Sequence, residues 1–213
     1  MFRVFVLVAL ALALQPRFHS SVEPLPAAAR HAIRATAWDP GCPLPLARLR
    51  VLTVSYWGFD RRAHVGQLAV NEDAAGPLAK VFRRLFELRF PIHHLGLADA
   101  YGSSRAVPRD GDISGSFDCK QAIPSPCEGG TGTGSWSEHA YGEAVDLNPI
   151  ENPYLGCGRV HDRRSRPYAD RSRPRRGMVT PAVIRAFRSI GWGWGGSWPG
   201  ATKDYTHFSV SGH

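Results

Sequence analysis

The sequence predicts an α+β fold with a small, mostly antiparallel sheet, two main helices and long loops. Short runs of β-branched and apolar residues are typical of strands, and two stretches carry apolar residues every three or four positions. The 22 glycines and 17 prolines favour long loops between these elements. The 213 residues, 43% of them hydrophobic, can build one domain with a core, which excludes wholesale disorder.

The N-terminus, residues 1–21, has the pattern of a secretory signal peptide. Arg3 precedes an apolar run over residues 4–14, which is too short to span a bilayer comfortably. Residues 11–13 and 20–21 are both candidate cleavage positions. We therefore expect the rest of the chain to be secreted or extracytoplasmic in the cell envelope, or anchored there if the leader is not cleaved.

Four cysteines fit an oxidising compartment: Cys42, Cys119, Cys127 and Cys157. Their spacing does not match paired zinc knuckles, so two disulfides are expected. Three connectivities are open, and we favour Cys119–Cys127 with Cys42–Cys157.

The first half of the chain contains one clear helix. Residues 22–48, rich in Pro, Ala and Arg, are expected to be a linker that leads into a domain over residues 49–213. Residues 49–56 predict a strand, and residues 90–95 predict another. Between them residues 77–89 predict a helix that starts at a first-turn proline, with apolar residues at helical spacing: Leu78, Val81, Phe82, Leu85 and Leu88.

The second half alternates loops with short elements. Residues 101–137 are rich in Gly, Ser, Pro and Asp and predict a loop, and residues 144–148 predict a short strand. An Arg-rich loop over residues 156–178 follows. Residues 180–190 predict the second helix, which begins with Thr-Pro and ends before a glycine, and residues 205–210 predict a closing strand.

The formal charge of +8 is concentrated in one loop. Residues 159–177 hold eight arginines and two aspartates, and the leader adds two arginines without an acid. The remaining body has no formal net charge. We therefore expect an anionic cell-wall polymer as a possible partner of the Arg-rich loop, a monomer, and no nucleic-acid partner. A solvated insertion is the alternative for this loop.

One stretch carries residues typical of a metal site. His139 and Asp146 are seven residues apart, with a turn at Gly142 between them. On the strand that follows, Ala144 and Asp146 share one face, and Val145 points to the other. A carboxylate on a strand face near a folded-back histidine suits a divalent metal.

The C-terminal strand can supply a third ligand. Tyr205, His207 and Ser209 share one face. Two histidines and one carboxylate, with a fourth position open, are typical of catalytic zinc. Asp204 is expected at the turn before the strand, where it could act as general base.

The combined motifs resemble peptidase family M15, which contains VanY-like zinc D,D-carboxypeptidases and endolysin-like L-alanyl-D-glutamate peptidases. The resemblance covers residues 49–210, with looser matches at residues 59–60, 116–120 and 148–154. The specific motifs are Ser137-x-His139-x-x-Gly142-x-Ala144-x-Asp146, Gly191-Trp192-x-Trp194-Gly195-Gly196-x-Trp198 and Asp204-x-x-His207-Phe208.

The resemblance implies a D,D-peptidase/Hedgehog-like fold with a zinc site on the sheet. It implies Zn2+ bound by His139, Asp146 and His207, with Asp204 as the catalytic acid and base. Lys120 stands where relatives usually carry arginine; it keeps the charge and loses the bidentate fork. The implied substrate is a D-amino-acid-containing stem peptide of bacterial peptidoglycan, cleaved by carboxypeptidase or endopeptidase action.

Several alternatives stay open. The chain could be a non-catalytic relative that keeps the metal and binds cell-wall peptide or a protein partner. Glu138 and Glu143 are alternative bases, and the tryptophans within residues 192–198 could either stack on sugar or pack. His93 and His94 are disfavoured as one metal pair, because neighbours on a strand point to opposite faces.

Overall fold

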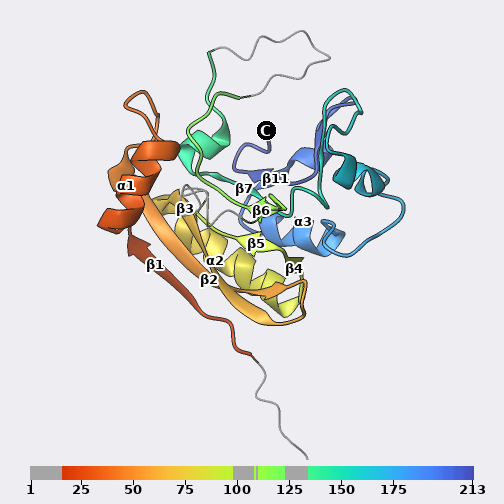
Figure 1. Ribbon diagram of the computed structural model, residues 1–213, viewed down its shortest axis with the longest axis horizontal. Coiled ribbons are helices and arrows are strands. Elements are labelled where there is room, and N and C mark those ends of the chain that lie inside the picture. The colour runs from red at the N-terminus through yellow and green to blue at the C-terminus, as the bar shows by residue number, and fades with distance from the viewer. Residues whose placement is uncertain (1–15, 98–107, 109, 123–133) are drawn as a thin grey trace, which may run out of the picture.

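The structure, a computed structural model, describes residues 16–97, 108, 110–122 and 134–213. Within these residues the fold is α+β, with three α-helices and several small, mostly antiparallel sheets (Figure 1). None of the helices in the described ranges is long and apolar enough to cross a membrane. Residues 1–15 lie outside the description, so the signal peptide stays a prediction.

The largest sheet is built around one long strand. β2 (Leu49–Gly58) pairs antiparallel with β3 (Ala63–Asn71) and with β1 (Ser20–Pro24), and its end pairs parallel with β4 (Pro91–Ile92). The strand expected over residues 49–56 is therefore confirmed.

Alternation along β2 directs apolar side chains to both faces of this sheet. Leu52 and Val54 pack with helix α2 (Glu72–Glu87) in the main hydrophobic cluster. Leu49 and Val51 join a second cluster with Ile33 of helix α1, on the opposite face. The sheet is thus covered by a helix on each side (Figure 1).

The segment expected to be a linker is part of the domain instead. Residues 22–48 contain most of β1 and all of α1 (Ala27–Thr36). Their sparse apolar side chains are buried against the β2–β3 sheet: Leu25, Ile33, Leu44 and Leu46. Residues 22–48 resemble a linker in composition because they contain few apolar residues. These few are nevertheless enough to cover one face of the sheet. The folded domain therefore begins near Ser20 rather than at residue 49.

Helix α2 also begins earlier than predicted. It starts at Glu72, and the Asn71 side chain caps it by accepting a hydrogen bond from the Asp73 N–H at 3.1 Å. Pro77, expected in the first turn, lies inside the helix. The apolar face is largely as predicted, except that Phe86 is buried rather than Leu88.

Helix α3 (Pro181–Arg188) confirms the second predicted helix. Thr180 Oγ1 accepts a hydrogen bond from the Val183 N–H at 3.4 Å, and Gly191 beyond the helix has a φ of +86°. Phe187 is fully buried and stacks on Phe208.

The site-bearing sheet lies in the C-terminal half. β11 (His207–Ser209) pairs antiparallel with β7 (Ala144–Asp146) on one side and with β9 (Gly193–Trp194) on the other. The two strands predicted over residues 144–148 and 205–210 thus lie next to each other.

The remaining elements are short. β10 (Lys203–Asp204) pairs antiparallel with β8 (Tyr154–Leu155), and β5 (His94–Leu95) pairs parallel with β6 (Ile113–Ser114). Four 3-10 helices complete the described chain: Leu46–Arg48, Glu138–Tyr141, Arg163–Tyr168 and Gly195–Ser197.

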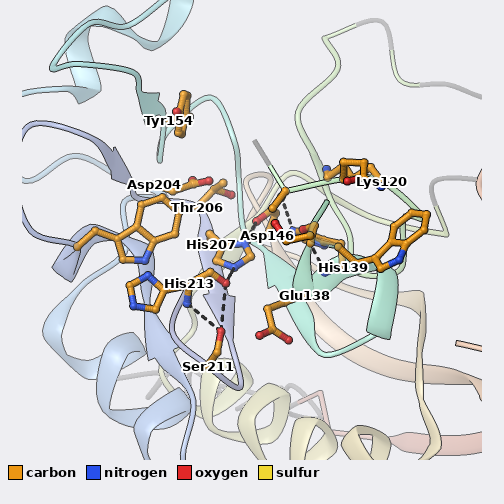
Figure 2. A pocket seen from close by; sticks show the side chains of 16 residues that line it. Lys120, Glu138, His139, Asp146, Tyr154, Asp204, Thr206, His207, Ser211 and His213 are labelled. Atoms are coloured by element: carbon orange, nitrogen blue, oxygen red, sulfur yellow. Dashed lines mark hydrogen bonds and ion pairs between the residues drawn. The ribbon is translucent and has the colours of Figure 1, made fainter. Parts of the chain in front are cut away.

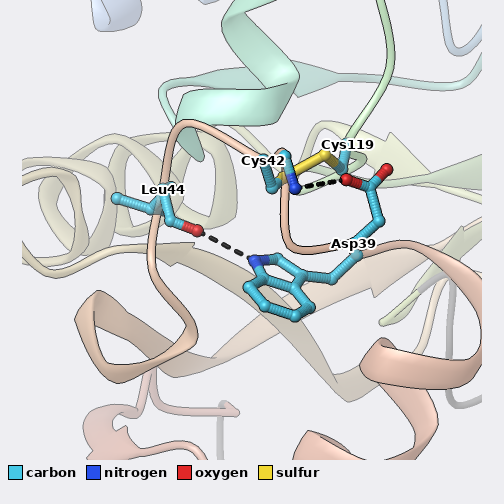
Figure 3. The surroundings of a disulfide bond; sticks show 6 residues. Asp39, Cys42, Leu44 and Cys119 are labelled. Carbon is cyan, nitrogen blue, oxygen red and sulfur yellow. Dashed lines mark hydrogen bonds between the residues drawn. A yellow bond between two sulfur atoms is a disulfide. The ribbon is translucent and has the colours of Figure 1, made fainter.

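The favoured disulfide connectivity is wrong. Cys42 bonds to Cys119, with Cα atoms 5.9 Å apart (Figure 3), rather than to Cys157, and Cys119 is not paired with Cys127. Cys157 is also disulfide-bonded, and Cys127 lies outside the described residues. The Cys42–Cys119 bridge ties the segment after α1 to the segment that carries Lys120.

Part of the Arg-rich loop is folded onto the domain. The Arg171 guanidinium donates hydrogen bonds to the main-chain oxygens of Glu151 and Val179, both at 3.0 Å, and lies over the Tyr205 ring. Burial lowers the pKa of Arg171 to about 10. This arginine is therefore structural, although it belongs to the charge excess noted in the sequence.

Candidate active site

Three side chains predicted as metal ligands meet at the β7–β11 edge of the C-terminal sheet. Asp146 and His207 are register partners on β7 and β11, so their side chains emerge side by side. His139 comes from the 3-10 helix Glu138–Tyr141, which precedes β7. Both histidines are buried, at 4% and 5% exposure.

A tight turn brings His139 back over the strand. Ser137 begins the 3-10 helix, and its Oγ accepts a hydrogen bond from the His139 N–H at 3.3 Å. Gly142 ends it with a φ of +64°, and a Cβ at this position would lie 2.6 Å from Asn71 N. Only glycine allows the turn to approach the end of β3, where the Asn71 N–H bonds to the Gly142 carbonyl.

The donor atoms of this cluster are evenly spaced. His139 Nε2 lies 3.2 Å from His207 Nδ1 and 3.3 Å from Asp146 Oδ2, and His207 Nδ1 lies 3.3 Å from Asp146 Oδ1. Zinc ligands at about 2.0–2.1 Å in a tetrahedral arrangement are separated by about 3.3 Å. The donor set therefore fits a zinc ion in both chemistry and spacing.

Main-chain carbonyls orient both imidazoles. His139 Nδ1 lies 2.5 Å from the Ser116 carbonyl oxygen, and His207 Nε2 lies 3.2 Å from the His213 oxygen. Because these oxygens only accept, a neutral imidazole at either position keeps its proton on the outward nitrogen and leaves the inward lone pair for a metal ion. This is the tautomer that metal binding requires.

Asp146 favours the ionised form in this setting. Burial opposes ionisation, but His139 and His207 outweigh it and hold the pKa of Asp146 well below its ordinary value. The cluster therefore provides the negative charge that a divalent cation needs.

Asp204 lies next to the cluster, on a separate strand. It ends β10, and a bend over residues 205–206 separates it from β11, which agrees with its expected place before the closing strand. Burial, followed by the charge of Asp146, raises the pKa of Asp204 to about 7. Its Oδ1 is buried and has no hydrogen-bond partner within the described residues.

Gly195 makes room for Asp204. A Cβ on Gly195 would lie 2.5 Å from the Asp204 carbonyl oxygen and 2.9 Å from its Cβ. One glycine of the Trp-Gly-Gly motif is thus required by the close approach of β10.

The cluster and Asp204 open on a cavity of about 480 Å³ (Figure 2). Lys120 also lines this cavity, where its Nζ lies 3.1 Å from Asp118 Oδ2 and its side chain is 43% exposed. All five site residues predicted from the sequence therefore border one cavity. Further lining residues include aromatic and acidic side chains: Trp136, Glu138, Tyr154 and Trp198.

The tryptophans of the Gly-rich motif divide between two roles. Trp192 is buried in the core, and Trp194 donates from Nε1 to the Tyr205 carbonyl at 2.9 Å. Trp198 lines the cavity, with its ring centroid 6.0 Å from that of His207. Packing therefore accounts for two of the three, and only Trp198 is placed to contact a ligand.

Two of the aromatic residues that line the cavity were not singled out in the sequence. Trp136 sits in a segment that was interpreted only as loop, and Tyr154 lies on β8 directly opposite Asp204. The Tyr154 hydroxyl is buried without a hydrogen-bond partner in the described part of the chain. The looser family match over residues 148–154 was a signal for Tyr154, but its pairing with Asp204 depends on contacts between distant parts of the sequence.

The alternative bases differ in position. Glu143 is not among the residues lining the cavity, and its Oε1 accepts a hydrogen bond from Asn71 Nδ2 at 3.1 Å, so its role is structural. Glu138 lines the cavity but lies on the other side of the cluster from Asp204 in Figure 2.

Comparison with known proteins gives one family match. Residues 131–210 match the family model of D-alanyl-D-alanine carboxypeptidase. No match was found among curated proteins or among solved structures. The matched residues include His139, Asp146, Asp204 and His207, whereas Lys120 lies before them. The match confirms that residues 131–210 carry the sequence features of peptidase family M15.

Proposed function

We propose that the protein is a zinc-dependent peptidase that hydrolyses D-amino-acid-containing stem peptides of bacterial peptidoglycan. The observation that carries this proposal is the convergence of two histidine nitrogens and the Asp146 carboxylate, with separations of 3.2–3.3 Å, beside Asp204 in one cavity. The family match supports a peptidase, and the substrate class rests on the resemblance to its relatives.

His139 Nε2, His207 Nδ1 and the Asp146 carboxylate would hold the zinc ion. When bound, zinc supplies Lewis acidity for the attack of water on a peptide carbonyl. The Ser116 carbonyl keeps the His139 ring in the required tautomer throughout the reaction.

Asp204 would act as general base and then as general acid. Its Oδ1 is free to accept a proton from the attacking water, because no described residue donates to it. The same carboxyl group would then deliver this proton to the leaving amine. Its position on β10, held by pairing with β8, keeps it beside the ligand cluster.

Lys120 would supply a positive charge for the scissile carbonyl or for a substrate carboxylate. Lys120 lines the cavity, and its ammonium group forms an ion pair with Asp118. An ion pair this exposed is weak, so a substrate anion can compete with Asp118 for Lys120.

The test is cleavage of defined muropeptides by the full-length protein, read by mass spectrometry with and without chelator. We expect chelator-sensitive release of D-alanine, or of a peptide fragment if the enzyme is an endopeptidase. Asp204→Asn should retain zinc and lose at least about 100-fold in kcat, the size of a general-base contribution. Asp170→Asn changes an exposed carboxylate of the Arg-rich loop and should leave the rate unchanged. Cleavage by chelated protein, or a full rate in Asp204→Asn, would refute the proposal.

A non-catalytic peptide-binding protein is the second candidate. The lysine at position 120, ion-paired with Asp118, is the observation that favours it. Zinc-loaded protein that binds stem peptide in calorimetry but never cleaves it would identify this function.

Secretion to the cell envelope and a contact with an anionic wall polymer complete the proposal. Exposed arginines of the Arg-rich loop remain available for such a polymer: Arg159, Arg163, Arg166 and Arg175. Binding to teichoic acid should weaken steeply with salt, whereas a solvated insertion would show no binding. We expect no nucleic-acid binding, and a monomer in sedimentation.

A further inference from the structure

A second group of histidine and carboxylate side chains lies outside the proposed active site. His93 Nε2 lies 3.1 Å from Glu151 Oε1 and 3.4 Å from Asp112 Oδ2. The three residues come from separate segments: His93 stands between β4 and β5, Asp112 directly precedes β6, and Glu151 follows β7. The ligand atoms of all three lie within 4.8 Å of one another.

We propose that His93, Asp112 and Glu151 form a second divalent-metal site, suited to a transition metal such as zinc. The site shares no residue with the His139 cluster, and the inference does not depend on the proposed peptidase activity.

Burial is the first argument for a cation. The side chains of Asp112 and Glu151 are only 3% and 4% exposed, so two acidic groups lie next to each other in the interior. Adjacent buried carboxylates are stabilised by a shared proton or by a cation, and burial together with the neighbouring Asp112 raises the pKa of Glu151 to about 8, so a metal ion would take the place of that proton. The nearby Arg171 guanidinium donates to the Glu151 main-chain oxygen, to the Asn152 side chain and to the Val179 carbonyl rather than to either carboxylate.

An imidazole alone does not satisfy this pair. His93 Nε2 has at most one proton to share between Glu151 and Asp112. Glu151 Oε2 is buried and accepts no hydrogen bond of normal geometry from any described residue. A divalent ion would bind the Nε2 lone pair and both carboxylates together, and it would satisfy Glu151 Oε2 as well if Glu151 binds through both oxygens.

The geometry is the second argument. The separations of 3.1 Å and 3.4 Å bracket the spacing of about 3.3 Å between tetrahedral zinc ligands. One imidazole with two carboxylates is a donor set for zinc or manganese, whereas calcium requires six to eight oxygens.

The ligand side chains are also held in place. Asp112 Oδ1 accepts a hydrogen bond from the Ile150 N–H at 3.0 Å, which leaves Oδ2 toward His93. The Phe59 ring stacks on the His93 ring at a centroid distance of 3.6 Å. Gly177 packs so closely that its Cβ would lie 2.4 Å from Phe59 and 2.9 Å from Glu151 Cγ.

His94 and Asp110 mark the approach to the site from solvent. Their side chains are more exposed, and His94 Nε2 lies 3.0 Å from Asp110 Oδ2. A bend at His93 separates β4 from β5, so strand alternation does not hold there. The ring nitrogens of His93 and His94 therefore come within 4.8 Å of each other, contrary to the expectation that neighbouring histidines diverge.

A metal here would join three parts of the fold. It would link the strands after α2 to the loop that leads into β8, which carries Tyr154 in the cavity. We therefore assign it a structural role that supports one wall of the active-site cavity.

The test is zinc binding to the full chain after demetallation, with stoichiometry measured by elemental analysis. Wild type should bind two equivalents. His139→Ala with His207→Ala should bind one, and adding Glu151→Gln should abolish binding. Glu151→Gln alone should bind one equivalent. Glu143→Gln is the matched control, because it removes a half-buried carboxylate outside both clusters, and it should bind two.

Thermal shifts separate loss of the site from loss of the fold. At about 100-fold excess over Kd, zinc should raise the Tm of the His139→Ala/His207→Ala protein by about 5–10 °C. Adding Glu151→Gln, or Asp112→Asn if that variant folds better, should abolish the shift without lowering the metal-free Tm. Absence of zinc binding by the His139→Ala/His207→Ala protein would overturn the proposal, whether or not the His139 cluster binds zinc in wild type. An undiminished shift in the triple variant, or an equal shift with Ca2+ in place of zinc, would also overturn it.

Discussion

Replacing Gly142 by alanine tests whether the turn at this residue positions His139. Two costs add in the Gly142→Ala protein. A non-glycine residue at a φ of +64° costs about 1–2 kcal/mol. A Cβ only 2.6 Å from Asn71 N, a main-chain atom, forces a shift of the turn or of β3, and such overpacking costs about 1–3 kcal/mol. The free energy of unfolding should fall by about 2–5 kcal/mol, and zinc affinity should fall with it because His139 moves.

Gly200→Ala is the matched control for this variant. Gly200 has a similar φ of +70°, but no described atom lies within 4 Å of a Cβ built there. The free energy of unfolding of Gly200→Ala should fall only by the cost of the left-handed conformation, about 1–2 kcal/mol. Its zinc affinity should be unchanged. Both variants restrict the unfolded chain equally, so their difference isolates the steric cost. Equilibrium urea unfolding and competition with a chelator measure the two quantities. Equal unfolding free energies, or unchanged zinc affinity in Gly142→Ala, would refute the reasoning.

Three further predictions follow from contacts near the site. Gly195→Ala should displace Asp204, because the new Cβ would lie 2.5 Å from its carbonyl oxygen, so kcat should fall while elemental analysis still finds zinc at the catalytic cluster. Phe208→Ala removes a fully buried ring from the core behind β7 and should lower the free energy of unfolding in urea by about 3–5 kcal/mol. Cys42→Ser with Cys119→Ser removes a bridge that closes a long loop, so calorimetry should show a stability loss of about 2–4 kcal/mol, and a loss under about 0.5 kcal/mol would contradict it.

The ligand cluster could be predicted because its geometry is local. Asp146 and His207 each stand on a short strand whose alternation sets the face of the side chain, and the turn at Gly142 lies between His139 and Asp146. The remaining requirement is that β7 pairs with β11, and this pairing is seen only in the structure. The motif resemblance implied that the three side chains meet, but it did not predict this pairing.

The parts that could not be predicted depend on distant contacts. Residues 22–48 have a linker-like composition, and Ile33 is buried only because it packs on the face of β2 that carries Leu49 and Val51. Disulfide connectivity requires the distance between Cys42 and Cys119, which no spacing rule contains. The start of α2 at Glu72 was missed because Pro77 is more typical of a first turn, although the Asn71 cap and two acidic residues were visible.

The two histidine and carboxylate clusters have nearly the same donor spacing, so spacing alone does not separate catalysis from structure. The His139 cluster opens on a cavity of about 480 Å³ and has Asp204 beside it, with an acceptor oxygen that no described residue occupies. The His93 cluster is instead packed against the Phe59 ring and Gly177, and its two carboxylate side chains are only 3% and 4% exposed. A zinc site performs chemistry when it keeps a position open for substrate, and it is structural when protein groups close it. The open cavity therefore supports the proposed peptide hydrolysis at the first cluster, and the burial of its carboxylates supports the proposed structural role of the second.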